Sequence, residues 1–214
     1  MARIPNGILG EFIGTAGNVS GYMRYGDNFL RSRRRKSSNV MTPKRLEQQQ
    51  KIKVCNEFTK PFAGQAFFNK TFPAYGSKGS GYNRATSAIL NQAIIGSYPD
   101  IAIAYPLVLI SKGPLPAPVD ALANPDAQGN ILFTWTDNTG TGTAKPDDKV
   151  VLVAYFTALR QIIYSLNAGT RADGQAILDI HHMQGPAAET WIGFVSADET
   201  NAADSVYTGK LTVV

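Results

Sequence analysis

The sequence contains very few of the residues that build metal centres and disulfide frameworks. Cys55 is the single cysteine among 214 residues, and the two histidines, His181 and His182, are adjacent. One cysteine excludes an intramolecular disulfide and a cysteine-rich zinc site. Adjacent residues of a strand point to opposite faces, so the two imidazoles are not expected to bind one metal ion together. We expect Cys55 to pack in the core as a small apolar residue.

Long apolar runs are also missing. The longest stretch, residues 101–110, is about half of the roughly 20 residues that a membrane helix needs, and Pro106 divides it. Near the start of the chain, glycines interrupt the apolar residues every few positions, which does not suit the core of a secretory signal. We therefore expect no membrane span and synthesis in the cytoplasm. Extracellular or particle-associated assembly would need an export route that the sequence does not show.

Patterns typical of enzymes are absent as well. No GxxxxGK[ST] run occurs, and no glycine loop joins a strand to a helix as phosphate sites require. Asp179 can share a strand face with His181, but no nucleophile has a recognisable setting near them. The Asx-rich ends of the Gly-Thr loop 137–148 do not fit the spacing of an EF-hand, and such residues are common in plain turns. We predict no catalytic residue, no cofactor, no metal and no small-molecule substrate.

Charge is distributed unevenly along the chain. Residues 1–60 contain 12 Lys/Arg and 4 Asp/Glu, whereas residues 111–214 contain 6 and 11. This asymmetry suggests a polyanionic partner for the basic part, or attraction between the basic part of one copy and the acidic part of another. The basic residues assigned to such a contact are Arg24, Arg31, Arg33, Arg34, Arg35, Lys36, Lys44 and Arg45. The acidic residues assigned to the partner surface are Asp147, Asp148, Asp198 and Glu199.

Residues 1–112 are predicted to form a basic α+β region. Each glycine inside a helix costs about 1 kcal/mol relative to alanine, so the glycine-rich start favours strands. Thr42 followed by Pro43 is typical of a helix start. The predicted strands are 8–13, 18–25 and 28–33, the predicted helices are 42–59 and 83–95, and a strand pair or bent strand is expected over 101–109.

Residues 113–214 are predicted to form a separate β-sandwich, which follows a proline-rich segment. Seven short strands in about 100 residues, separated by polar turns, are typical of an immunoglobulin or fibronectin III-like sandwich. The whole chain is therefore predicted to be mainly β with a smaller helical component. The predicted strands are 116–121, 130–136, 149–156, 160–166, 175–180, 189–197 and 205–213.

Several motifs carry resemblances to known proteins. LPAP, ILFTWTD with Trp135 as its inward aromatic residue, KVVLVAYF, ETWIGFVSAD and SVYTGKLTVV resemble a fibronectin type III-like domain, although the loop TDNTGTGTAKPDD departs from that pattern. The whole chain resembles an uncharacterised family of Bacteroidota proteins through MARIPNGILGEFIGTAGNVSGY, RSRRRKS, TPKRLEQQQK, SYPDIAIAYPLVLISKGPLP, FTWTDN, TRADG and SVYTG. This second resemblance implies no activity, because the family has none assigned.

These features favour a non-enzymatic structural subunit that self-associates through its basic N-terminal region. Contacts between two different surfaces of one chain generate rings, tubes or filaments. The alternative is a nucleic-acid-binding or capsid-like protein that uses the same basic cluster. Tyr22, Tyr25 and Phe29 lie among the basic residues and can stack on bases, although aromatic residues on one strand face more often simply pack. A hydrolase centred on Asp179 and His181 is the third hypothesis.

Overall fold

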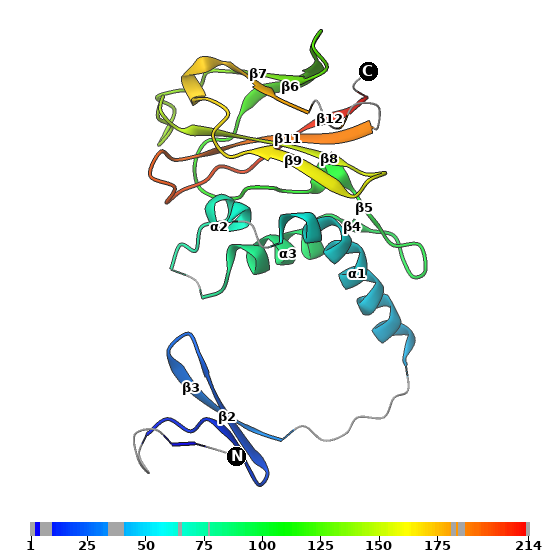
Figure 1. Ribbon diagram of the computed structural model, residues 1–214, viewed down its shortest axis with the longest axis vertical. Helices are drawn as coiled ribbons and strands as arrows, with labels where there is room; N and C mark the ends of the chain where they lie inside the picture. Colours follow the sequence, from blue (N-terminus) through cyan, green and yellow to red (C-terminus); the bar gives the residue numbers. More distant parts are fainter. Residues whose placement is uncertain are drawn as a thin grey trace. The chain divides into compact units, whose positions relative to one another are not determined.

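The chain folds into two compact units, residues 1–42 and residues 43–214, and each is described by itself. The computed structural model describes residues 3–4, 10–33, 41–63, 66–76, 78–180, 183 and 187–212 (Figure 1). Five residues named above lie outside these ranges, namely Arg34, Arg35, Lys36, His181 and His182. His181, on which the hydrolase hypothesis depends, and part of the basic cluster therefore lie outside the described residues.

The first unit is a three-stranded antiparallel sheet in the order β1-β2-β3. The strands are β1 (Gly14–Ala16), β2 (Val19–Arg24) and β3 (Asp27–Ser32). Tyr25 and Gly26 join β2 to β3, and both have positive φ, 54° and 85°, as a two-residue type I′ hairpin turn requires. These strands confirm the predicted 18–25 and 28–33. Of the predicted strand 8–13, residues 8 and 9 are not described, and Ile13 forms a single bridge with Arg3.

The second unit begins with three helices. The first and third confirm the two helix predictions, and the second was not predicted. The helices are α1 (Pro43–Thr59), α2 (Phe67–Thr71) and α3 (Gly81–Gln92), followed by the short antiparallel pair β4 (Ile94–Ile95) and β5 (Ala102–Ile103). The strand pair or bent strand expected within 101–109 is not formed, because Ala102–Ile103 pairs with Ile94–Ile95, at the end of the predicted helix 83–95. Tyr105–Leu107 is a 3-10 turn, and Pro106 has no N–H to donate to a strand ladder. No helix within the described residues is long and apolar enough to cross a membrane.

Two antiparallel sheets form the sandwich. One has the order β10-β7-β6 and the other β12-β11-β8-β9. Their strands are β6 (Val119–Pro125), β7 (Ile131–Thr136), β8 (Lys149–Phe156), β9 (Gln161–Ser165), β10 (Gln175–Leu178), β11 (Ala187–Val195) and β12 (Val206–Thr212). Phe133 and Trp135 of β7 are buried with Leu152 and Phe194 of the facing sheet. The seven predicted strands and the inward position of Trp135 are confirmed.

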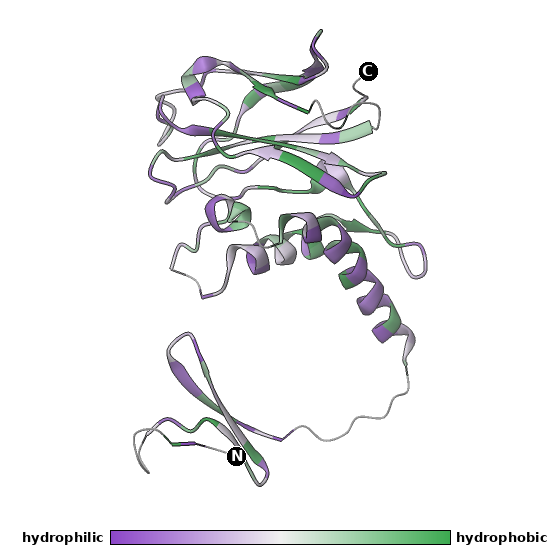
Figure 2. Cartoon of the chain, viewed as in Figure 1, coloured by the Kyte–Doolittle hydropathy of each residue, from purple (hydrophilic) through white to green (hydrophobic). Residues whose placement is uncertain are grey.

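The four-stranded sheet is covered on both faces, because the helices pack on the face turned away from β7 (Figure 1). Phe58 of α1 contacts Tyr155 of β8 and Trp191 of β11, with ring centroids 5.0 and 6.0 Å apart. Hydrophilic and hydrophobic residues are mixed along α1 (Figure 2), and Cys55, near its C-terminal end, is buried as expected. The predicted boundary at 112/113 therefore lies inside the second unit, where helices and sandwich share one apolar cluster.

Candidate functional site

The hairpin of the first unit brings arginines and aromatic residues onto one face of its sheet. Tyr22 lies opposite Phe29, and Arg31 lies opposite Ser20, which is two residues from Tyr22. Residues directly opposite each other, and residues two apart on one strand, share a face. Tyr22, Arg24, Phe29 and Arg31 therefore form one surface, called the aromatic-basic face below.

The chain before β1 packs against the opposite face of this sheet. A Cβ atom on Gly21 would lie 2.1 Å from the backbone oxygen of Phe12, so only glycine admits this contact without a shift. The Asn28 side-chain amide donates a hydrogen bond to the same oxygen at 3.1 Å. The aromatic-basic face in contrast leaves Tyr22 and Phe29 37% and 41% exposed.

Ring contacts order the side chains of the aromatic-basic face. The rings of Tyr22 and Phe29 stack with centroids 5.7 Å apart and planes inclined by 20°. The Arg31 guanidinium lies 5.3 Å from the centroid of Tyr22. At the turn, Arg24 lies 5.0 Å from the centroid of Tyr25, and their hydrogen bond raises the pKa of Arg24. Exposed cation-π contacts of this kind contribute about 0.5–1 kcal/mol, enough to hold the charged groups over the rings.

The other predicted basic residues that the structure describes take no part in this stack. Arg33 follows β3 directly and donates its backbone N–H to Asn18 at 2.6 Å. Lys44 and Arg45 lie in the first turn of α1, which belongs to the second unit. The structure therefore brings Arg24 and Arg31 together with the aromatic rings and leaves Lys44 and Arg45 on a different element.

Two of the four predicted acidic residues form ion pairs within the chain. Asp148 is buried and accepts hydrogen bonds from Arg171 at 3.0 Å, so it is not a surface residue. Glu199 is bound by Lys70 and Lys149, and these contacts lower its pKa. Asp147 and Asp198 are exposed.

Exposed carboxylates gather at one end of the sandwich. The loops 137–148, 166–174 and 196–204 meet there, since Lys149 pairs with Val195 and forms a bridge with Thr170. The same loops carry one exposed lysine, Lys145, whereas their exposed carboxylates are Asp137, Asp147, Asp173, Asp198 and Asp204. This group is called the acidic loop end below. Asp137, Asp173 and Asp204 were not among the predicted acidic residues, although the alternation of strands and loops placed their loops at one end.

Arg171 holds these loops in place. Its guanidinium is fully buried, donates to Asp148 Oδ2 and to Asn138 Oδ1, and lies 3.9 Å from the centroid of Phe194. Burial lowers the pKa of Arg171, and Asp148 acts in the opposite direction. Asn138 and Asp148, at the two ends of the Gly-Thr loop, thus bind a guanidinium. Within the described residues, no three His, Cys, Asp or Glu side chains are grouped to bind a metal.

Comparison with known proteins gives one match. A family model described as a family of unknown function (DUF6266) matches residues 11–209. No curated protein and no solved structure matches the chain. The matched range includes both the aromatic-basic face and the acidic loop end.

Proposed function

We propose that this chain, which belongs to the DUF6266 family of unknown function, is a non-enzymatic structural subunit that self-associates. In this proposal the aromatic-basic face of one copy binds the acidic loop end of the next. The observation that carries it is the exposed Tyr22–Phe29 stack with Arg31 held against it. Aromatic residues and arginine are the types that contribute most to protein interfaces.

Charge supports a head-to-tail contact. Residues 1–42 contain seven Lys/Arg and two Asp/Glu, whereas residues 43–214 contain 14 of each, so the first unit carries the whole net charge of +5. The acidic loop end offers five exposed carboxylates, and the pKa of Asp198 is lowered to about 2 by hydrogen bonds from Ser196 and Thr200. Because the two surfaces differ, the contact repeats from copy to copy and builds a ring, tube or filament.

Burial supports the same contact. A three-stranded sheet needs a covered hydrophobic face to be stable in water. On the aromatic-basic face, the first unit leaves the rings of Tyr22 and Phe29 37% and 41% exposed. Covering these groups in an interface contributes about 25 cal/mol for each Å² of apolar surface removed from water.

The second candidate is a nucleic-acid-binding or capsid-like protein that uses the same face. The stacked rings with adjacent arginines favour it, since single strands bind to aromatic residues that stack on bases within a basic groove. Self-association is preferred because it also uses the acidic loop end, which would repel a polyanion.

Two narrower proposals concern the fold family of the sandwich and the relatives of the whole chain. The three-stranded sheet packed on the four-stranded sheet supports a fibronectin III-like identity for the sandwich. The sequence motifs support kinship with Bacteroidota proteins.

A charge-swap experiment tests the contact by sedimentation velocity on nuclease-treated protein. Arg24→Glu/Arg31→Glu changes one surface and Asp147→Lys/Asp198→Lys changes the other. We expect each variant alone to associate at least about tenfold more weakly than the natural chain, and an equimolar mixture to regain association. Lys53→Glu/Lys210→Glu is the control, with the same charge change at exposed positions outside both surfaces.

Two results would overturn the proposal. One is a natural chain that stays monomeric at low salt and binds an added oligonucleotide, which selects the second candidate. The other is a control variant that weakens association as much as Arg24→Glu/Arg31→Glu does.

A further inference from the structure

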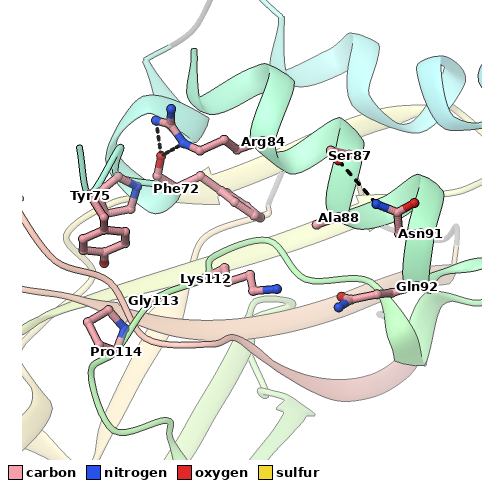
Figure 3. A pocket seen from close by; sticks show the side chains of 11 residues that line it. Phe72, Tyr75, Arg84, Ser87, Ala88, Asn91, Gln92, Lys112, Gly113 and Pro114 are labelled. Atoms are coloured by element: carbon pink, nitrogen blue, oxygen red, sulfur yellow. Dashed lines mark hydrogen bonds between the residues drawn. The ribbon is translucent and has the colours of Figure 1, made fainter. Parts of the chain in front are cut away.

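The second unit contains a cavity beside loop 196–204 of the acidic loop end, since Gly113 lines the cavity and donates its backbone N–H to Asp204 at 3.0 Å. It has a volume of about 580 Å³ and lies between α3, the chain that follows α2, and the segment that leads into the sandwich (Figure 3). Its size is within the range of about 300–1,000 Å³ that is usual for small-molecule sites.

One end of the cavity is apolar and held in a fixed shape. Phe72, Tyr75 and Pro114 line it, and the Tyr75 hydroxyl accepts a hydrogen bond from the backbone N–H of Ala202 at 3.0 Å. Tyr75 has a φ of 43°, a left-handed conformation that costs a non-glycine residue about 1 kcal/mol or more. A Cβ atom on Gly113 would lie 2.3 Å from the Tyr75 hydroxyl, so glycine is needed beneath the ring.

The other end of the cavity is polar and has a cation available for a ligand. The side chains of Lys112 and Gln92 point toward one another, and Asn91 donates a hydrogen bond to Ser87 at 3.4 Å (Figure 3). Among the described residues, no hydrogen-bond or ion-pair partner is found for the Lys112 ammonium group.

Arg84 also lines the cavity, but its charge is already engaged. Its guanidinium donates to the carbonyl oxygen of Phe72 at 2.9 and 2.6 Å and to that of Gly79 at 2.8 Å. None of the residues that line the cavity is an aspartate or a glutamate. A cationic ligand would therefore find no counter-charge among the lining residues, and the neighbouring Asp204 carboxylate already accepts the backbone N–H of Gly113 at 3.0 Å. A phosphate group would meet only one ammonium group in this cavity, whereas phosphate sites usually offer several charged donors.

We propose that this cavity binds a small monocarboxylate that carries an aromatic or branched apolar group. The Lys112 ammonium and the Gln92 amide bind the carboxylate, and the apolar group packs between Phe72, Tyr75 and Pro114. The chemistry of binding is independent of the self-association proposed above. It adds a small-molecule ligand to a chain for which the sequence indicated none.

The probe for this site is 3-phenylpropionate, titrated into the full ¹⁵N-labelled chain and followed by amide chemical shifts. We expect saturable shifts at residues of α3 and around Gly113, and binding about tenfold weaker for the neutral 3-phenylpropanamide. Lys112→Met should weaken binding of the carboxylate about tenfold and leave the amide unchanged. Lys145→Met is the matched control, because Lys145 is exposed and does not line the cavity.

Ser87→Phe is a second variant, which places a ring at the cavity from an exposed position of α3 and should block both probes. The unfolding curve of each variant shows whether it remains folded. The proposal would be overturned if no saturable shift occurred up to about 10 mM 3-phenylpropionate, which corresponds to a binding free energy weaker than about −3 kcal/mol. Equal binding of the carboxylate by Lys112→Met and by the natural chain would also overturn it. Tighter binding of 2-phenylethyl phosphate than of 3-phenylpropionate would also overturn it, by showing that the site prefers a phosphate.

Discussion

At the residue scale, the ion pair between Arg171 and Asp148 is the most consequential polar contact of the sandwich. Arg171→Met would leave the Asp148 carboxylate buried without its cation, and such losses cost about 3–5 kcal/mol. Urea denaturation should show this decrease in the free energy of unfolding. Arg160→Met removes an exposed pair with Glu57 at 3.6 Å and should cost less than about 1 kcal/mol. Equal effects of the two variants would contradict the role given to Arg171.

Asp198 gives the chain a testable dependence on pH. Hydrogen bonds from Ser196 and Thr200 lower its pKa to about 2 in the folded state, below the value of 3.8 for a free side chain. The carboxylate therefore stabilises the fold above about pH 4, and this contribution is lost as pH falls toward 2. Thermal unfolding between pH 6 and 2 should show a smaller decrease in Tm for Asp198→Asn than for the natural chain. Parallel curves would show that Asp198 does not contribute.

Single residues differ in how far the sequence could place them. Cys55 was correctly predicted to be buried, because a lone cysteine among helix-forming residues usually packs as a small apolar group. Asp148 was assigned to a surface beside Asp147, and it is buried. Its partner Arg171 lies 23 residues later, in a turn whose position depends on how β9 and β10 are placed in different sheets. Sequence spacing alone contains no sign of that pairing.

At the scale of elements, α1 is joined to the sandwich through one aromatic residue. Phe58 contacts Phe62, Tyr105, Tyr155 and Trp191 with ring centroids 5.0–6.3 Å apart. Phe58→Ala should destabilise the second unit by about 3–5 kcal/mol and keep a single cooperative transition, measured by tryptophan fluorescence and by circular dichroism.

Ile52→Ala is the control on the same helix, since Ile52 is 41% exposed and its truncation should cost less than about 1 kcal/mol. Two separate transitions in Phe58→Ala, with that of the sandwich unchanged, would instead support independent folding of residues 113–214.

The strands were predictable from their composition, and the layers were less so. β-Branched and aromatic runs between polar turns identified all seven sandwich strands. The apolar run KVVLVAYF of β8 does not alternate, and such runs are typical of strands buried on both faces. That signal could have shown that another layer covers the sheet. The identity of this layer, α1 to α3, depends on contacts between distant aromatic residues such as Phe67 and Tyr164.

At the scale of the whole molecule, two units differ in charge and in how completely they bury their apolar residues. The second unit has two apolar clusters and equal numbers of charges of each sign. The first is a basic sheet of three short strands with exposed aromatic rings. This contrast is the physical basis for proposing that the first unit binds outside its own sheet.

The most direct test is light scattering during size-exclusion chromatography of the nuclease-treated chain, at about 50 mM and about 500 mM salt. The account predicts multimers at low salt that are weakened at high salt, and a monomer for Tyr22→Ser/Phe29→Ser under both conditions. Leu122→Ser/Ile177→Ser, which changes two residues that are 59% and 55% exposed on the sandwich, should assemble like the natural chain. A natural chain that is monomeric at both salts, or a Tyr22→Ser/Phe29→Ser variant that assembles normally, would contradict the proposed self-association.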